Sequence, residues 1–315
     1  MARTGLVYHP FFIEHDSGPG HPERPARLAA VMEQLERGGT GGRCIRLTPD
    51  EAPQAALERI HTAEHVEHIA RLSRLGRLVA ETPDTLVSPA TFRAARLAAG
   101  AILEAVDGVM SGRIDNAFCP VRPPGHHAEM DQALGFCYFN NIAIAARHLQ
   151  EKHGVERVAI VDWDVHHCNG TQHSFEDDPS VFVFSVHQFS PGFFPGTGGR
   201  EETGTGPGAG YTLNVPLPPG QTNADYLTVF REQLRPALDS FQPRFVLVSA
   251  GFDTHKADPL AGMELTDDAF GELTREVLTI ASRHCQGRVV SILEGGYDLT
   301  ALAASVERHV EALLG

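Results

Sequence analysis

Two aspartates and one histidine stand at positions where their side chains can hold a single divalent cation. Asp164 and His166 are two residues apart, just after the apolar run VAIV, so an extended backbone would turn both side chains to one face. Asp253 follows another apolar run, VLVSAG. One imidazole and two carboxylates neutralise a dication and leave room for water and substrate, as a catalytic zinc requires. We therefore predict one Zn²⁺ per chain, although Fe²⁺ and Co²⁺ accept the same ligands.

Two adjacent histidines, His126 and His127, end the stiff segment RPPGHH. Adjacent imidazoles suit paired proton transfers, because a metal lowers the pKa of bound water from about 15.7 to about 7 and a neutral histidine can take the remaining proton. Tyr297 follows two glycines, whose flexible backbone would let its hydroxyl reach an oxyanion opposite the metal. Together these groups favour metal-assisted hydrolysis.

Short apolar runs must position these side chains. Polar residues follow five such runs: RPPGHH after AFCPV, DWDVHH after VAIV, His187 after VFVFSV, Asp253 after VLVSAG, and EGGY after VVSIL. The runs are continuously apolar, which is typical of strands buried on both faces of a parallel sheet. Since ligands bind beyond the carboxyl ends of such strands, we expect the five ends to share one edge.

Helical stretches alternate with the strands, so we predict a three-layer αβα architecture. The stretch 190–210 is rich in glycine and proline, yet strand-like segments flank it. We interpret it as a long functional loop within a single catalytic domain, 1–315. The predicted helices are 23–37, 88–110, 140–153, 222–240, 266–283 and 298–314.

The composition excludes several classes of function. The 315 residues are 42% hydrophobic and 21% charged, as in ordinary globular chains. A net charge of −14 repels phosphate backbones and anionic lipids, so we expect no nucleic-acid or membrane partner. No membrane-length apolar run or signal-peptide pattern occurs, so we expect a cytoplasmic location. The five cysteines form no C-x-x-C pair, which favours reduced thiols.

The motifs RPPGHHA, GFCYFNN, DWDVHH, NGTQ, SAGFD, DPL and EGGY resemble those of zinc-dependent histone deacetylases, class II. They are also similar to those of bacterial deacetylase-like amidohydrolases and acetylpolyamine amidohydrolases. The order and spacing agree from about His15 to Tyr297. The resemblance implies the arginase/deacetylase fold, an α/β structure with a central, mainly parallel eight-stranded sheet. It also implies hydrolysis of acyl amides to acetate and a free amine.

The resemblance assigns catalytic roles residue by residue. It makes His127 the general base and acid and His126 its electrostatic partner. A carboxylate at the position of Asp162 hydrogen-bonds the first histidine, and the amide of Asn169 orients the second without stabilising its cation. Tyr297 matches the residue that polarises the scissile carbonyl. The implied zinc ligands are Asp164, His166 and Asp253.

Two aromatic residues, Phe136 and Phe194, match the walls of the family's narrow acyl-lysine tunnel, which would strip a four-methylene stem of water. Asp84 matches the rim carboxylate that holds the substrate backbone. Leu260 stands where a glutamate would resemble the polyamine-selective branch, so we favour an acylated lysine peptide over a small acylated amine. Two glycines complete the predicted substrate-binding set: Gly135 and Gly295.

The resemblance also implies structural K⁺ at two sites. The inner site would use carbonyl and side-chain oxygens of Asp162, Asp164, His166, Ser185 and Val186. The outer site would use Phe175, Asp178, Val181 and Tyr211. Arg27 would line an internal exit for acetate.

Three alternatives to an acyl-lysine hydrolase stay open. A polyamine deacetylase would share every site residue, and an acidic chain suits polyamines as well as basic peptides. A binding module would recognise acylated ligands without turnover. An arginase-like manganese ureohydrolase would need more carboxylate ligands than the sequence places. The sequence also leaves the acyl-chain preference and the oligomeric state open, a homo-oligomer included.

Three further features have structural interpretations. The spacing of His61, His65 and His68 would allow a metal-binding stripe, but nearby glutamates favour a solvated helix face. Cys168 replaces a glycine that is usual in the family, and if that glycine needs a positive φ the cysteine costs on the order of 1 kcal/mol of strain. Phe193 is interpreted as ordinary packing.

Overall fold

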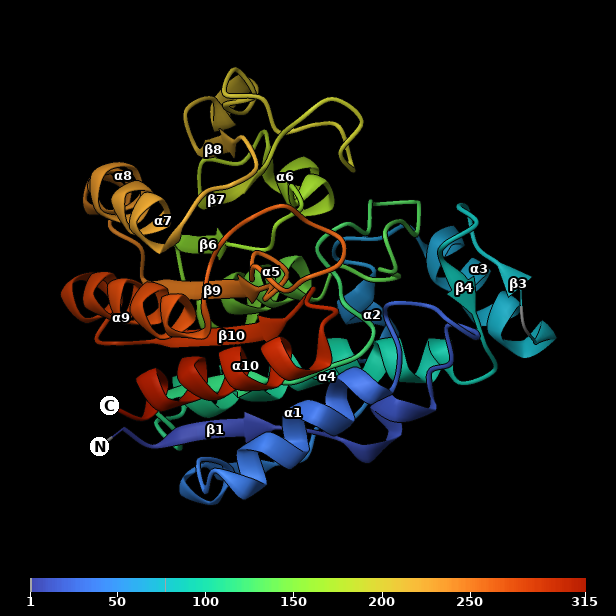
Figure 1. Cartoon of the computed structure of the whole chain (residues 1–315). Coiled ribbons are helices and arrows are strands. Elements are labelled where there is room, and N and C mark those ends of the chain that lie inside the picture. Colours follow the sequence, from blue (N-terminus) through green and yellow to red (C-terminus); the bar gives the residue numbers. More distant parts are fainter. Residues whose placement is uncertain (1, 77) are drawn as a thin grey trace.

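The computed structural model describes residues 2–76 and 78–315. Its main strands are β1 (Thr4–Val7), β2 (Ile45–Leu47), β5 (Asn116–Cys119), β6 (Val158–Asp162), β7 (Val181–Gln188), β8 (Thr212–Leu217), β9 (Phe245–Ala250) and β10 (Val289–Leu293). They form one sheet in the order β2-β1-β5-β10-β9-β6-β7-β8, and every neighbouring pair is parallel. Figure 1 shows this sheet rising through the molecule from β1 to β8.

Helices cover both faces of the sheet. One layer consists of α1 (Ala26–Arg37), α7 (Asn223–Val229), α8 (Arg235–Phe241), α9 (Asp267–His284) and α10 (Leu299–Leu314). The other layer consists of α4 (Thr91–Met110), α5 (Asn141–His153) and α6 (Asn169–Phe175). In Figure 1, α9 and α10 lie in front of the strands and α5 lies behind them. The predicted three-layer αβα architecture is therefore confirmed.

Smaller elements lie outside these layers or join them. They are the 3-10 turns η1 (Pro10–Glu14), η2 (Gly41–Arg43) and η3 (Gly206–Gly208), the π turn η4 (Phe230–Leu234), the helices α2 (Gln54–Leu57) and α3 (Ala63–Leu75), and the strands β3 (Leu78–Val79) and β4 (Leu86–Val87). The antiparallel pair β3-β4 lies beside α3 at one side of the molecule.

Local sequence sets the limits of the helices. The Asn140 side chain accepts the N–H of Ala143 at the start of α5, and Gly154 ends that helix with φ of 64°, a conformation that favours glycine. Asp298 caps α10 in the same way by accepting two backbone N–H groups. The Asn140 and Asp298 side chains therefore fix where α5 and α10 begin.

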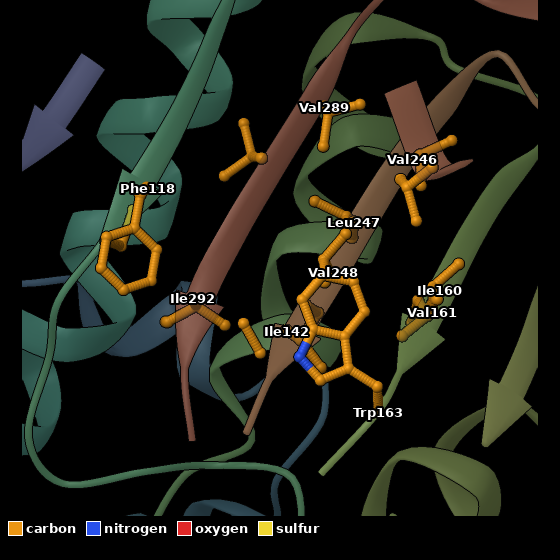
Figure 2. Packing of buried hydrophobic residues seen from close by; sticks show 14 of the residues in the cluster. Phe118, Ile142, Ile160, Val161, Trp163, Val246, Leu247, Val248, Val289 and Ile292 are labelled. Carbon is orange, nitrogen blue, oxygen red and sulfur yellow. The ribbon is translucent and has the colours of Figure 1, made fainter. Parts of the chain in front are cut away.

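The core lies between the sheet and its two helical layers. Figure 2 shows apolar side chains of the central strands, such as Val161, Val248 and Ile292, packed with the indole of Trp163. All four are at most 1% exposed. Because the central strands are buried on both faces, their carboxyl ends are held rigidly. Side chains at that edge of the sheet are therefore held in fixed positions.

The sequence predicted five of these strands and every long helix of the two layers close to their observed bounds. The segment after residue 210, described from the sequence only as strand-like, forms β8. The sequence did not identify β1 and β2, whose short runs carry little signal. The predicted helix 23–37 begins at Ala26 instead, directly after Pro25 at its N-cap. Glu23 lies before the helix, and its buried carboxylate binds Arg27 and Arg122. Across the described residues, no helix is both long and apolar enough to cross a membrane.

Candidate active site

Four adjacent strands deliver polar residues to one edge of the sheet. They are neighbours in the order β5-β10-β9-β6 and run parallel, so their carboxyl ends lie together. The segments that follow them are those singled out from the sequence: 122–127, 294–297, 253 and 162–167. The sheet therefore assembles one site from segments far apart in the chain.

Asp164, His166 and Asp253 meet at the centre of this edge. Each offers one ligand atom, and these atoms all lie within 4.8 Å of one another. The Nδ1 atom of His166 lies 3.0 Å from Oδ1 of Asp164 and 3.3 Å from Oδ2 of Asp253. Both carboxylates are fully buried. Two buried carboxylates beside one imidazole are costly without a cation, so the arrangement fits a dication.

One carboxylate oxygen supports this fit most directly. Oδ1 of Asp253 accepts the N–H of Val165 at 2.8 Å, whereas the buried Oδ2 has no hydrogen-bond partner among the described residues. Burial, together with the charge of Asp164, raises the pKa of Asp253 to about 7. Gly295 leaves space beside this oxygen, because a Cβ there would lie 2.0 Å away. A bound Zn²⁺ would satisfy the orphaned oxygen.

His126 is paired with a carboxylate. Its Nδ1 atom lies 2.9 Å from Oδ2 of Asp162, and Oδ1 of the same aspartate accepts the N–H of Asp164 at 2.9 Å. Burial alone would lower the pKa of His126, but the carboxylates of Asp162, Asp164 and Glu294 outweigh it and raise the pKa to about 10. The surrounding carboxylates therefore favour the protonated form of His126.

His127 is paired with an amide instead. Its Nδ1 atom lies 2.7 Å from Oδ1 of Asn169. Burial, reinforced by the positive charge of His126 and His166, holds the pKa of His127 well below 6.5. The two imidazole rings are 4.0 Å apart between centroids but differ in charge. The neutral ring can accept a proton while its neighbour stays cationic, which is the division expected of an acid–base pair.

A cavity of about 270 Å³ opens onto these groups. It is lined by His127, His166 and Tyr297. The ring of Phe194 stands edge-on to His127, with centroids 4.9 Å apart, and that of Phe136 lies 6.0 Å from Tyr297. Apolar walls of this kind bury a flexible methylene chain. The lining includes these predicted substrate residues: Asp84, Gly135, Phe136, Phe194 and Leu260.

Phe193 and Gly295 lie elsewhere than expected from the sequence. Phe193, interpreted from the sequence as ordinary packing, also lines the cavity and stacks on His166, with centroids 5.2 Å apart and planes 4° from parallel. Gly295, predicted to bind substrate, lies beside the carboxylates, and its N–H donates to Oδ2 of Asp164 at 2.7 Å. Gly135 has φ of 55°, and a Cβ there would lie 2.6 Å from Cδ2 of His127. Glycine is thus required where the wall meets the histidine.

Tyr297 is held from both sides. Its N–H donates to Oδ2 of Asp258 at 2.7 Å, and the Arg27 guanidinium lies 4.9 Å from the centre of its ring. Arg27 also donates to the carbonyls of Glu294 and Gly296 at 2.6 Å each, which fixes the EGGY segment. Burial raises the pKa of Tyr297 well above 10, so the hydroxyl keeps a proton to donate.

The mouth of the cavity combines a carboxylate and an apolar residue. Asp84 and the 39% exposed Leu260 lie at this rim. His21 supports it, because its Nε2 atom lies 2.9 Å from the carbonyl of Asp84 and its ring lies 4.7 Å from that of Phe136. The N-terminal segment therefore helps to shape the entrance.

The solvated face predicted for the histidines at 61–68 is wrong for two of them. His61 and His65 are each 2% exposed. Nδ1 of His61 donates to the carbonyl of Glu129 at 2.9 Å, and its Nε2 accepts the N–H of Asn140 at 2.8 Å. These histidines tie the start of α3 to the loop that carries the cavity wall.

The cysteine at the family's glycine position causes no backbone strain. Cys168 has φ of −80° and ψ of 59°, and the N–H of Asn169 donates to the carbonyl of His167 at 2.9 Å across it. This tight turn is open to any L residue. The strain considered from the sequence is therefore absent at this residue.

Some of the residues predicted to hold K⁺ lie close together. Asp162 and Ser185 are paired across β6 and β7, next to the other residues predicted for the inner site. At the outer site, the N–H of Asp178 donates to the carbonyl of Phe175 at 3.0 Å. The carbonyl of Tyr211 accepts the N–H of Val183 at 2.9 Å.

A second cluster of ligand types lies away from the cavity. Asp107, His148 and His153 also bring ligand atoms within 4.8 Å of one another. However, Nζ of Lys152 lies 2.7 Å from Asp107, and Nη1 of Arg59 lies 3.3 Å from Nδ1 of His148. Two cationic side chains oppose a dication here, so the group of Asp164, His166 and Asp253 fits a dication better than this cluster does.

Two buried or partly buried acids at the site were not assigned from the sequence. Glu294 accepts the N–H groups of Gly125 and His126 at 2.7 and 3.2 Å, which shapes the turn before the histidine pair. Burial raises the pKa of Glu294 to about 7. Glu129 accepts an N–H of the Asn169 amide. The motifs EGGY and HHAE contain both acids, but a single sequence does not tell which way they point.

Comparison with known proteins agrees with this geometry. The profile of the histone deacetylase domain matches residues 21–313. A probable deacetylase of Archaeoglobus fulgidus is 42% identical over 94% of this chain and 82% of its own length. The polyamine deacetylase HDAC10 of Homo sapiens is 42% identical over 99% of this chain, and histone deacetylase 4 of Caenorhabditis briggsae is 40% identical over 99%. The matches cover 48% and 38% of those two longer proteins.

A solved structure shows the same fold. The HDA15 HD domain superposes with a TM-score of 0.95 at 38% identity, covering 100% of this chain and 88% of that one. The predicted arginase/deacetylase fold is thus confirmed. Because the domain profile spans most of the sequence and close relatives align along nearly all of it, the chain belongs to the histone deacetylase family of amide hydrolases.

Proposed function

We propose that this chain hydrolyses Nε-acyl-lysine in a peptide or protein with the help of one Zn²⁺, releasing acetate, or a longer acid, and the free amine. One observation carries the proposal. Three convergent metal ligands, a neutral histidine and a protonated tyrosine meet at the end of one apolar cavity. This combination matches what hydrolysis of a linear amide requires.

Asp164, His166 and Asp253 would hold the ion. When bound, Zn²⁺ would polarise the scissile carbonyl and lower the pKa of the attacking water. Fe²⁺ or Co²⁺ would fit the same ligands. We further propose that K⁺ occupies the two predicted sites, where the inner one would stabilise the turn that carries Asp164 and His166.

The residues of the chain would manage the protons. The Nε2 atom of His127 would accept a proton from the attacking water, since its Nδ1–H is committed to Asn169. The Tyr297 hydroxyl would donate a hydrogen bond to the oxyanion as it forms. The His126 imidazolium, held by Asp162, would offset the negative charge, and a histidine would return the proton to the leaving amine.

The cavity supports a lysine side chain as the amine. Phe136 and Phe194 would flank its methylene groups, and the backbone of a peptide would meet Asp84 at the rim. Leu260 at the mouth adds no charge, so Asp84 is the one carboxylate among the described residues that line the cavity. The net charge of −14 favours basic peptides.

A polyamine substrate is the second candidate. The human relative that is 42% identical over 99% of this chain is named a polyamine deacetylase, and an acidic protein attracts polyamines too. The two candidates share the hydrolytic groups, so only the entrance separates them.

A metal assay combined with a substrate panel tests the proposal. The panel contains acetyl-lysine, trifluoroacetyl-lysine and longer acyl-lysine peptides, acetylputrescine and acetylspermidine. We expect about one metal ion per chain and a kcat/KM at least tenfold higher for an acyl-lysine peptide than for either polyamine. The opposite ratio would assign a polyamine deacetylase. Hydroxamate binding without acetate release would indicate a non-catalytic binding module, and about two metal ions per chain would indicate an arginase-like centre.

A further inference from the structure

A chain of hydrogen bonds leads from the imidazole of His127 to a carboxylate that the proposed reaction does not use. Nδ1 of His127 lies 2.7 Å from Oδ1 of Asn169. On the other side of that amide, Nδ2 of Asn169 donates to Oε1 of Glu129. The Glu129 side chain is 19% exposed, while Asn169 is 3% exposed.

The chemistry of these groups allows one direction of donation. A carboxylate only accepts, so the Asn169 amide must turn its NH₂ toward Glu129. Its oxygen then faces His127, and because an amide oxygen only accepts, Nδ1 of the imidazole must carry the proton. In a neutral imidazole this leaves Nε2 with a free lone pair. The carbonyl of His127, 3.3 Å from Nδ2, is a second acceptor that favours the same amide orientation.

We propose that Glu129 is a positioning residue that fixes the tautomer of His127 through the Asn169 amide. The inference rests on the proposed function, in which Nε2 of His127 takes the proton from water. If Glu129 offered no acceptor, the longer contact to the carbonyl would alone oppose a flip of the amide. A flipped amide would present NH₂ to Nδ1, force the proton onto Nε2, and leave no base facing the cavity.

The loop around Glu129 is built to hold it in place. Its N–H donates to the carbonyl of Gln132, and its carbonyl accepts from the buried His61, both at 2.9 Å. On the solvent side, Nδ1 of His173 lies 3.0 Å from both carboxylate oxygens. The backbone of Glu129 is thus held by two hydrogen bonds, and its carboxylate by His173 and Asn169. A charged acceptor in a partly dry site makes a strong hydrogen bond.

The interposed amide explains why two adjacent histidines differ. His126 touches the carboxylate of Asp162 directly, which both orients the ring and stabilises its positive charge. His127 is separated from the carboxylate of Glu129 by Asn169, so it receives the orientation without a direct ion pair. A carboxylate therefore stands behind both histidines, but it makes a direct contact with only one of them.

Two substitutions of similar volume test the inference. Glu129→Gln keeps an acceptor oxygen for Asn169, whereas Glu129→Met removes it. With an acetyl-lysine peptide, we expect Glu129→Met to lower kcat about tenfold with KM changed less than about twofold, and Glu129→Gln to stay within about threefold of the wild type. Nitrogen-15 spectra of the side chains should show Nδ1–H for His127 in the wild type and Glu129→Gln, and a mixed or Nε2–H tautomer in Glu129→Met.

Asp131→Asn is the matched control, because this acid lies two residues along the same loop and its carboxylate makes no hydrogen bond to any described residue. It should leave kcat and the His127 spectrum unchanged. Metal content and melting temperature of each variant show whether the fold is retained. Wild-type kcat with a pure Nδ1–H tautomer in Glu129→Met would overturn the inference, as would equal losses in both Glu129 variants. Lack of turnover by the wild type would refute the proposed function instead, and the spectra would still decide the tautomer.

Discussion

A Cβ atom on Gly295 would lie 2.0 Å from Oδ2 of Asp253. That oxygen is the buried one without a hydrogen-bond partner in the described part of the chain. The N–H of Gly295 also donates to Oδ2 of Asp164 at 2.7 Å. The backbone that leaves β10 is thus pressed against two carboxylates from β6 and β9, and the missing side chain is what lets them converge.

Gly295→Ala should therefore weaken metal binding without altering a ligand. The methyl group must displace Asp253 or move the backbone, and we expect at least a tenfold loss of metal affinity, as for other changes to the groups that support ligands. Metal content after dialysis against a weak chelator measures this. Gly42→Ala is the control, since a Cβ at Gly42 meets nothing within 4 Å. Full metal content in Gly295→Ala would contradict the assigned ligand set.

The hydroxyl of Tyr297 gives a prediction about the chemical step. Tyr297→Phe removes a donor that is needed only when the oxyanion forms, so kcat should fall about 10²- to 10³-fold with little change in KM. Steady-state kinetics on an acetyl-lysine peptide measure both constants. Tyr226→Phe is a suitable control, because the buried Tyr226 hydroxyl has no partner among the described residues. Near-normal turnover by Tyr297→Phe would rule out its assigned role.

The buried ion pairs of Glu23 should make the stability of the fold depend on pH. Its carboxylate is fully buried and binds Nη2 of Arg122 at 2.7 Å and Nη1 of Arg27 at 3.1 Å. Burial alone would raise the pKa of Glu23, but the two guanidinium groups outweigh it and hold the pKa well below 4.5. The folded pKa lies below the unfolded one. The stabilisation is therefore present above about pH 4.5 and is lost as the pH falls.

Glu23→Gln should lower the free energy of unfolding by about 3–5 kcal/mol at pH 7, because two buried guanidinium groups lose their counter-charge. Urea unfolding at pH 7 and at pH 4 measures both the loss and its pH dependence. The variant should lose less stability between these pH values than the wild type. An equal decline in both proteins would mean that other groups cause the acid sensitivity.

The polar residues at the strand ends were predictable from the sequence, because a parallel sheet brings the carboxyl ends of its strands to one edge. Asp164 and His166 follow a continuous apolar run, and Asp253 follows another, so the carboxyl edge had to gather them. His61 and Glu129 gave no such signal. A polar residue in a loop has the same local pattern whether it faces water or the core. Packing between distant segments decides the matter, as where Glu23 meets Arg122, 99 residues away.

The residue at position 260 should influence whether the entrance favours an acyl-lysine peptide or an acylated polyamine. It lies at the mouth of the cavity, and its N–H donates to Oδ1 of Asp258 at 2.9 Å, which fixes the backbone there. Leu260→Glu would add a carboxylate where the distal ammonium of a polyamine would lie. One ion pair at a partly exposed site contributes about 1 kcal/mol. We therefore expect the ratio of kcat/KM for acetylspermidine to that for an acetyl-lysine peptide to rise about fivefold.

Leu260→Gln separates charge from shape in this prediction. Glutamine has nearly the volume of glutamate without its charge, so it should leave the ratio close to that of the wild type. The rise in Leu260→Glu should also shrink at high ionic strength, because an exposed ion pair is screened by salt. If both variants changed the ratio equally, or if salt had no effect, the entrance would select its substrate by shape, and the charge at this rim position would not govern the choice between lysine and polyamine.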